Sequence, residues 1–201
     1  MKISSLMVPN PITITEEASI RDAIELMKVN SIRHLPVVSG GMTLKGFVTL
    51  ADLKQGLIPS MVGNLSLSDI MIRNPITVHP DDDIEIAAQK CYKHKIGGIP
   101  VVKEGQVVGI ITETDILRAF IDMMGILNAS SRIDVVINDS PGSFKRALQI
   151  INDTGGDIIS VGMTAQQVSR RIYYFRLSPC KIRTIKEALE KEGFEVLATM
   201  D

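Results

Sequence analysis

This chain of 201 residues has few cysteines, no tryptophan and almost no net charge. The two cysteines, Cys91 and Cys180, stand far apart, which argues against a disulfide framework or a zinc site. The formal net charge is −1 without a dense basic cluster, so we expect neither nucleic acid nor a membrane as a partner. The N-terminus lacks an apolar signal-like run, and the chain has no stretch of about 18 apolar residues. We therefore expect a cytoplasmic protein.

The motifs of common enzyme classes are missing as well. The chain contains no Gly-x-Ser-x-Gly, P-loop, zinc-ligand or dinucleotide-binding pattern, and its three histidines are scattered. We expect no catalytic residues, no metal ligands and no catalytic cofactor. Aromatic residues make up 4% of the chain and aliphatic residues are abundant, which favours a mixed α/β fold with aliphatic cores.

An internal duplication organises the first two thirds of the chain. Asn-Pro-Ile-Thr at 10–13 returns 64 positions later at 74–77, and Pro-Val-Val at 36–38 returns at 100–102. After one deletion the offset becomes 63, which aligns Gly46 with Gly109 and Thr-x-x-Asp at 49–52 with the same pattern at 112–115. Each copy also predicts the same elements: an amphipathic helix after Ser19 or Asp83, a β-branched strand, a turn, a second strand and another helix.

The repeated pattern resembles the CBS module, which occurs in tandem as a Bateman pair. The resemblance implies one module at 1–62, a second at 63–127, and a pseudo-two-fold axis relating two clefts. In that family the clefts bind adenosyl ligands (AMP, ADP, ATP or S-adenosylmethionine) as regulators. The resemblance predicts a first site of Ile12, Thr13, Arg33, His34, Pro36, Thr49 and Asp52, and a second of Ile76, Thr77, Gly98, Pro100, Thr112, Asp115 and Arg118.

The roles within these sites follow partly from the family and partly from chemistry. The aspartates would bind ribose hydroxyls, and Arg33 can neutralise phosphate. Thr-x-x-Asp is also an ordinary helix-capping pair, and one residue can serve both purposes. The Gly97-Gly98 pair either makes room for a bulkier ligand or accommodates a tight backbone. Arg118 either contacts phosphate or pairs with Asp115 one turn away.

Two further features have simple structural interpretations. The acidic run at 81–83 precedes a helix, which favours capping over metal binding. Cys91 occupies the position of Met27 on the apolar face of its helix, so we predict a buried, unreactive thiol.

The last 70 residues predict a second kind of domain, at 131–201, after a short linker. Strands are expected at 133–137, 158–161, 172–177 and 194–198, and helices near 144–151 and 182–192. This βαββαβ order is ferredoxin-like, so the whole chain falls in the α/β (α+β) class. With Asp-Ser-Pro-Gly before the first helix, the segment resembles an ACT domain. The resemblance implies an amino acid or similar small effector at the loop Asp139, Ser140, Pro141 and Gly142, which otherwise reads as a tight turn.

The order CBS–CBS–ACT resembles the bacterial acetoin-utilisation accessory proteins. It implies a non-enzymatic sensor that controls a metabolic enzyme, for example in acetoin or acetyl metabolism. The alternatives are a ligand-free scaffold for protein interactions or an enzyme without a recognised motif. Exposed apolar residues at the end of the second module, and dimerisation in both families, predict a homodimer. The regulated partner is not indicated by the sequence.

Overall fold

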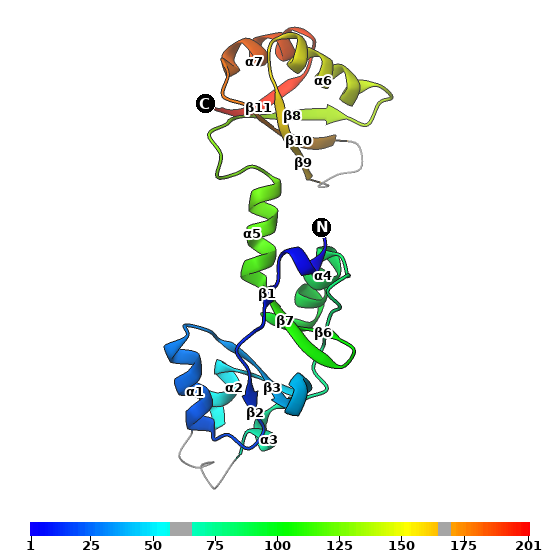
Figure 1. The fold of residues 1–201 in the computed structure, drawn as a ribbon. Helices are drawn as coiled ribbons and strands as arrows, with labels where there is room; N and C mark the ends of the chain where they lie inside the picture. Colours follow the sequence, from blue (N-terminus) through cyan, green and yellow to red (C-terminus); the bar gives the residue numbers. More distant parts are fainter. Residues whose placement is uncertain (57–65, 165–169) are drawn as a thin grey trace. The chain divides into compact units, whose positions relative to one another are not determined.

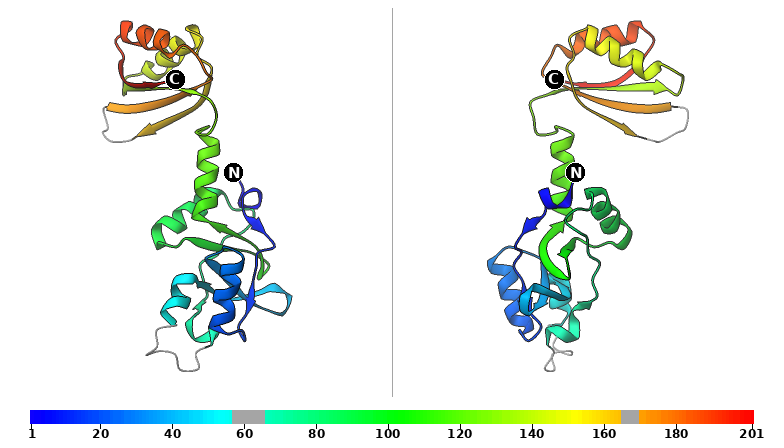
Figure 2. Two further views of the ribbon diagram at one scale, coloured as in Figure 1. Left: turned by 90° about the vertical axis from the view of Figure 1, so that its left-hand side faces the viewer. Right: turned by 45° about the vertical axis from the view of Figure 1, so that its right-hand side comes forward.

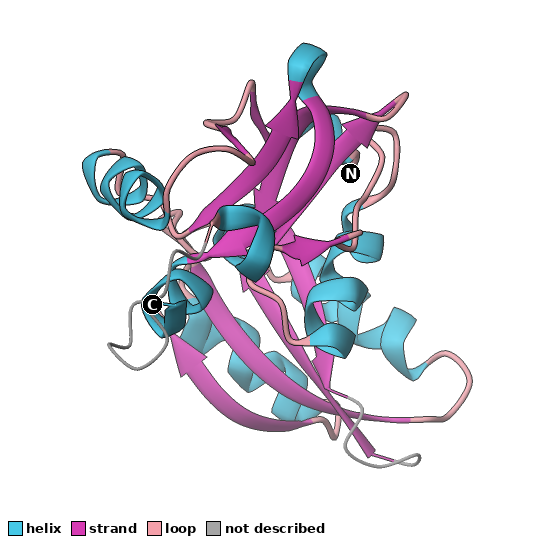
Figure 3. Ribbon diagram, turned by 90° about the horizontal axis from the view of Figure 1, so that it is seen from below, coloured by secondary structure: helices cyan, strands magenta, loops and turns pink. Residues whose placement is uncertain are grey.

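The computed structural model describes residues 1–56, 66–164 and 170–201, and these form two compact units, Met1–Leu117 and Arg118–Asp201. Helices and strands make up most of the described chain (Figure 3). None of the described helices is long and apolar enough to cross a membrane.

The first unit contains both repeats, with short strands and helices (Figure 1). In chain order its elements are η1 (Ile3–Ser5), β1 (Val8–Pro9), β2 (Ile14–Thr15), α1 (Ile20–Val29), β3 (His34–Ser39), η2 (Gly40–Met42), β4 (Thr43–Thr49), α2 (Leu50–Gly56), α3 (Leu67–Ile70), β5 (Ile72–Arg73), α4 (Ile84–His94), β6 (Gly98–Lys103), β7 (Gln106–Thr112) and the first residues of α5 (Glu113–Met123).

Local signals set the ends and faces of the first helix in each repeat. Ser19 and Asp22 form the predicted capping box at α1, and the apolar positions of the helix face a core. Cys91 of α4 is buried as predicted, and burial is the main cause that raises the pKa of its thiol. Asp83 occupies the N-cap position of α4, but its side chain caps nothing; it lies 3.0 Å from Nζ of Lys2 instead. Asp83 is therefore the N-cap residue, as predicted, but the prediction that its side chain caps the helix is wrong.

The two repeats exchange their first segments. β1 pairs with β7 of the second repeat, Val8 opposite Ile110, and β5 pairs with β4 of the first repeat, Ile72 opposite Phe47. Figure 1 shows the dark-blue β1 beside the green β7. Each repeat otherwise builds its own hairpin, β3 with β4 and β6 with β7. The predicted boundary after residue 62 divides the sequence repeat, whereas each folded module includes the first segment of the other repeat.

Side-chain packing follows the exchange. Leu67 and Met71 of the second repeat lie in the core of the first, against residues such as Leu35. A Cβ added at Gly46 would lie 2.4 Å from Sδ of Met71, and one added at Gly109 would lie 2.4 Å from Sδ of Met7. These close contacts favour glycine at the equivalent place in both hairpins, because a methionine of the other repeat covers it.

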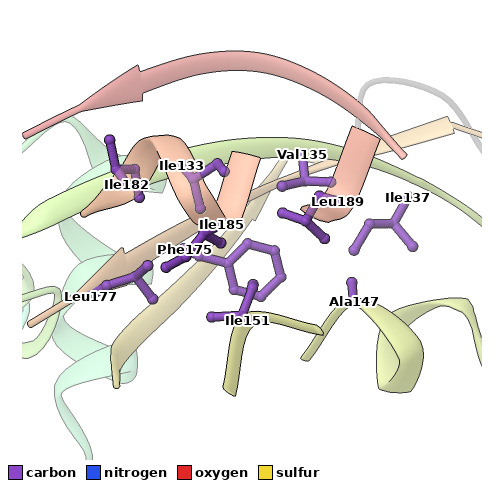
Figure 4. Packing of buried hydrophobic residues seen from close by; sticks show 10 residues of the cluster. All are labelled: Ile133, Val135, Ile137, Ala147, Ile151, Phe175, Leu177, Ile182, Ile185 and Leu189. Atoms are coloured by element: carbon purple, nitrogen blue, oxygen red, sulfur yellow. The ribbon is translucent and has the colours of Figure 1, made fainter. Parts of the chain in front are cut away.

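The second unit is a four-stranded antiparallel sheet with two helices, in the βαββαβ order that the sequence predicts. The strands lie in the order β11-β8-β10-β9, and Figures 1 and 2 show α6 and α7 on the same face. The core beneath these helices is aliphatic around a single buried Phe175 (Figure 4). The elements are β8 (Ser131–Asn138), α6 (Ser143–Asp153), β9 (Ile158–Thr164), β10 (Arg170–Leu177), α7 (Ile182–Lys191) and β11 (Glu195–Met200).

The opposite face of this sheet carries a buried charged pair and is partly covered by the segment before β8. Asp134 is 4% exposed and accepts two hydrogen bonds from the guanidinium of Arg132, at 2.7 and 2.6 Å. That guanidinium also lies over the ring of Tyr174. Oγ of Ser160 donates to the carbonyl oxygen of Met124 at 2.8 Å, so the segment that precedes β8 packs on the sheet. The three neighbouring aromatics of β10 thus divide between the two faces, as strand alternation predicts.

Candidate functional site

A cavity of about 800 Å³ opens in the first unit and brings residues of both repeats together. The Asn-Pro-Ile segment of the first repeat and both Thr-x-x-Asp segments contribute to its walls. Its volume falls in the range of ordinary small-molecule sites. The lining residues are Val8, Asn10, Pro11, Ile12, Ser31, Ile32, Arg33, His34, Thr49, Leu50, Ala51, Lys54, Gly97, Ile110, Thr112, Glu113, Thr114 and Asp115.

Each Thr-x-x-Asp pair forms a capping box at the strand-to-helix junction. Oδ2 of Asp115 accepts from the backbone N–H of Thr112 at 2.8 Å and from its hydroxyl at 2.6 Å. Thr49 and Asp52 make the same two bonds at 2.9 and 2.7 Å. Among the described residues, Oδ1 of Asp115 accepts no hydrogen bond. The capping interpretation is confirmed, and it leaves one oxygen of this carboxylate for a ligand.

The Gly97-Gly98 pair accommodates a side chain of the other repeat. A Cβ added at Gly98 would lie 2.9 Å from Cγ of His34, and one added at Gly97 would lie 3.1 Å from its Nε2. The imidazole also stacks on Phe47, with ring centroids 6.0 Å apart. The imidazole of His34 therefore lies against both glycines, and Gly97 also lines the cavity, so the role of the pair in making room for a ligand stays a prediction.

Burial and charge act together on His34. Burial is the main cause that lowers the pKa of the imidazole, and Arg33 lowers it further. Glu113 and Asp52 oppose this shift but do not reverse it. The lowered pKa favours the neutral imidazole, which has one donor and one acceptor nitrogen.

The family model for the CBS domain matches the chain twice, over residues 3–58 and 67–122. The two matches together cover more than half of the chain. The chain belongs to the CBS-domain family.

Solved CBS structures share this fold. The CBS domain pair of protein MJ0100, in complex with 5-methylthioadenosine and S-adenosyl-L-methionine, is 34% identical with a TM-score of 0.56, covering 60% of this chain and 95% of that one. A putative acetoin utilization protein (AcuB) from Vibrio cholerae is 31% identical with a TM-score of 0.58, covering 63% and 96%. CBSX2 in complex with AMP is 29% identical with a TM-score of 0.54, covering 60% and 96%.

Curated relatives carry the CBS pair within longer chains. The homoserine O-acetyltransferase of Methanocorpusculum labreanum is 41% identical over 114 residues, which is 56% of this chain but 23% of the relative. The chain therefore spans about a quarter of the length of that relative, and the similarity concerns the CBS pair.

The cavity of the CBS pair combines parts of both predicted sites. It takes Ile12, Arg33, His34 and Thr49 from the first and Thr112 and Asp115 from the second. The other eight predicted residues do not line it: Thr13, Pro36, Asp52, Ile76, Thr77, Gly98, Pro100 and Arg118. The residue-level assignments to a ligand stay predictions, but the structure groups six of them around one space.

Several residues off the cavity have other partners. The hydroxyl of Thr13 donates weakly to Sδ of Met42 at 3.9 Å, and the carbonyl oxygen of Thr77 accepts from Nζ of Lys90 at 2.7 Å. Arg118 lies 3.9 Å from Asp122, not beside Asp115 as one interpretation proposed, and its side chain is strongly exposed. The predicted ion pair with Asp115 is therefore wrong, because the (i, i+4) partner is the one in reach.

Sequence reasoning missed two charged residues of the cavity, Lys54 and Glu113. Both lie on the helices that follow the Thr-x-x-Asp threonines, but Lys54 comes five residues after Thr49 and Glu113 directly after Thr112, so no common helical spacing indicated them. Asn10 was quoted as part of the repeat motif but not as a site residue. It adopts a left-handed φ of 47°, as does Asn74 at 52°, a conformation that asparagine tolerates better than most residues.

The predicted effector loop lies between β8 and α6 in the second unit. Asp139 is exposed and lies 3.3 Å from Nη2 of Arg171, and Oγ of Ser140 lies 2.9 Å from Oγ of Ser143. Gly142 has φ 86°, which a side chain would strain, and it occupies the N-cap position of α6. The loop is a tight turn held by polar contacts to β10 and α6, and its predicted role toward an effector stays a prediction.

Proposed function

We propose that this chain is a regulatory adenosyl-ligand sensor in which the CBS pair binds the ligand inside the shared cavity. One observation carries the proposal: a cavity of ligand size joins Ile12 of the Asn-Pro-Ile motif to Thr112 and Asp115 of the other repeat. The two structures with bound adenosyl compounds, of MJ0100 and CBSX2, support it by similarity.

The geometry suits a ribose at Asp115. Its Oδ2 is occupied by the cap, while Oδ1 can accept a hydrogen bond from a ribose hydroxyl. Ile12 and Ile110 supply apolar surface on which a purine ring can pack.

The first experiment is native mass spectrometry of the freshly purified chain, followed by titration calorimetry with adenosine, AMP, ADP, ATP and S-adenosylmethionine. We expect a retained or added adenosyl ligand of unchanged mass after incubation, because a sensor binds without turnover. Binding of none of these compounds would reject the adenosyl proposal and favour a ligand-free scaffold. Conversion of the ligand would show an enzyme.

The variant Asp115→Ala separates the ligand role from the cap. We expect it to weaken adenosyl binding by about 1–3 kcal/mol, the scale of a lost charge-assisted hydrogen bond. The matched control is Asp22→Ala, which removes an equivalent capping box from α1 outside the cavity. Equal affinities of the two variants would assign Asp115 to capping alone. Asp52→Ala in the same titration tests the other predicted ribose contact.

For the second unit we propose an ACT-type role, the binding of an amino acid or similar small effector at residues 139–142. The support is the ferredoxin-like βαββαβ order with strand order β11-β8-β10-β9, and the turn that begins α6. A thermal-shift screen of the full chain against the common amino acids tests this role. A hit that is lost in Asp139→Ala would support the loop assignment, and a screen without hits would reject the effector.

We further propose that the chain acts as a homodimer on a metabolic enzyme, for example in acetoin or acetyl metabolism. The similarity to the structure named for acetoin utilization supports the pathway class, and the exposed apolar residues of α5, such as Leu117 and Phe120, support assembly. Light scattering at micromolar concentration tests the dimer against the monomer mass of 22.0 kDa. A monomer that persists with ligand added would reject it.

A further inference from the structure

The charged residues of the cavity break the symmetry of the duplication. Arg33 aligns with Gly97, and Lys54 aligns with Leu117, so both cations come from the first repeat alone. Glu113 aligns with Leu50, so this carboxylate comes from the second repeat alone. The lining of the shared cavity thus carries two cations from the first repeat and an added acid from the second.

None of these three side chains is neutralised by a neighbour. Among the described residues, Arg33, Lys54 and Glu113 form no ion pair and no side-chain hydrogen bond. Glu113 lies beside the glycine pair, with Oε2 3.4 Å from a Cβ added at Gly97. Charged residues that line a cavity without protein partners can interact with a ligand. They select the ligand by its charge and orientation more than by its shape.

The balance of charge points to one class of ligand. A monophosphate carries about two negative charges near pH 7, which Arg33 and Lys54 together can match. A triphosphate adds about two more negative charges. In a cavity of about 800 Å³ the longer chain also approaches Glu113, which repels it.

We propose that Arg33, Lys54 and Glu113 make this cavity selective for an adenosine monophosphate type of ligand over a triphosphate. The phosphate lies against Arg33 and Lys54, and Glu113 at the start of α5 repels additional phosphates. The proposal rests on the proposed function of the CBS pair, and it adds the charge state and the orientation of the ligand.

The test is a calorimetric titration of the full-length wild type, Glu113→Gln and Lys54→Gln with adenosine, AMP and ATP at one fixed ionic strength. In the wild type we expect AMP to bind more tightly than both adenosine and ATP. Glu113→Gln should tighten ATP binding about fivefold relative to AMP, the scale of one partly exposed charge interaction. Lys54→Gln should weaken AMP about fivefold and leave adenosine unchanged.

The matched controls make the same change of charge at residues outside the cavity. Glu85→Gln removes the equivalent first-turn acid of α4, and Lys45→Gln removes an exposed lysine of β4; neither residue lines the cavity. Both controls should retain wild-type selectivity. Repeating the titrations at high salt should shrink the differences, because exposed charges are screened.

The outcomes separate the two proposals. If the wild type binds no adenosyl compound, adenosine included, the proposed function fails. If it binds them but prefers ATP to AMP, or if Glu113→Gln shifts all three ligands equally, the function stands and the charge selection is overturned.

Discussion

The contact between His34 and Gly98 ties the two modules together, and the variant Gly98→Ala tests it. An added methyl group would meet the imidazole at 2.9 Å from Cγ, 3.0 Å from Cδ2 and 3.2 Å from Nδ1. Movement of the ring toward Phe47 is limited, because the two rings stack with centroids 6.0 Å apart. Gly98 itself is buried at the start of β6 and lies in register with Thr112.

The magnitude follows from two opposing effects. Overpacking of a filled core site costs about 1–3 kcal/mol. Replacing glycine by alanine restricts the unfolded chain, which returns about 0.4–1 kcal/mol where the backbone is compatible. The net expectation is a loss of about 1–2 kcal/mol in the free energy of unfolding.

The assay is urea unfolding of the full chain, with Gly40→Ala as the matched control. Gly40 has no atom within 4 Å of an added Cβ, so the same substitution there should be neutral or slightly stabilising. The double variant His34→Ala/Gly98→Ala should recover most of the loss, giving a coupling energy of about 1 kcal/mol or more. Equal stabilities of Gly98→Ala and Gly40→Ala, or additive effects in the double variant, would refute the interlocking of His34 and Gly98.

Three further predictions concern stability. Ile3→Ala should cost about 2–4 kcal/mol in urea despite its place near the terminus, because this side chain is 0% exposed, and a loss no larger than that of the exposed Ser4→Ala would contradict the segment exchange. Burial and Arg33 lower the pKa of His34, so the unfolded chain binds a proton at this residue more readily than the folded chain. The free energy of unfolding should therefore be highest above about pH 6.5 and fall as the pH drops below it. His34→Asn should flatten that fall in unfolding curves from about pH 7.5 to about pH 5. Asp134→Ala removes a buried acceptor and should cost about 1–3 kcal/mol, whereas Glu187→Gln in an exposed pair should cost under about 0.5 kcal/mol; similar values for both would show that burial adds nothing.

Local patterns predicted most elements correctly because they act over a few residues. Ser19 and Asp22 signal the start of α1 through a capping box that needs no tertiary context. The split of Tyr174 from Phe175 across the second sheet follows from strand alternation alone. Asp83 shows the limit of such signals. Its N-cap position was predicted correctly, but its carboxylate forms an ion pair with Lys2, which is distant in the sequence.

The sequence predicted part of the candidate site but not the complete set of residues that line it. Six predicted residues do line the cavity, since threonine and aspartate at a strand-to-helix junction have few other arrangements. Lys54 and Glu113 were missed because a single charged residue on a helix reads as a solvated surface position. Only the packing of the two repeats shows that both face the same space.

The sequence by itself determined the duplication, the helix caps and the period of each strand, because these depend on residue type and short spacing. It could not decide which hairpin β1 joins. Gly46 and Gly109 are equivalent in the repeat, so Met7 fits either one by pattern, and only the folded chain places it on Gly109. The same degeneracy hid the place of His34 over Gly98 and the merging of two predicted sites. Two similar copies offer equivalent local partners at these positions, and the length of the connecting chain and the packing between the copies decide which partner is used.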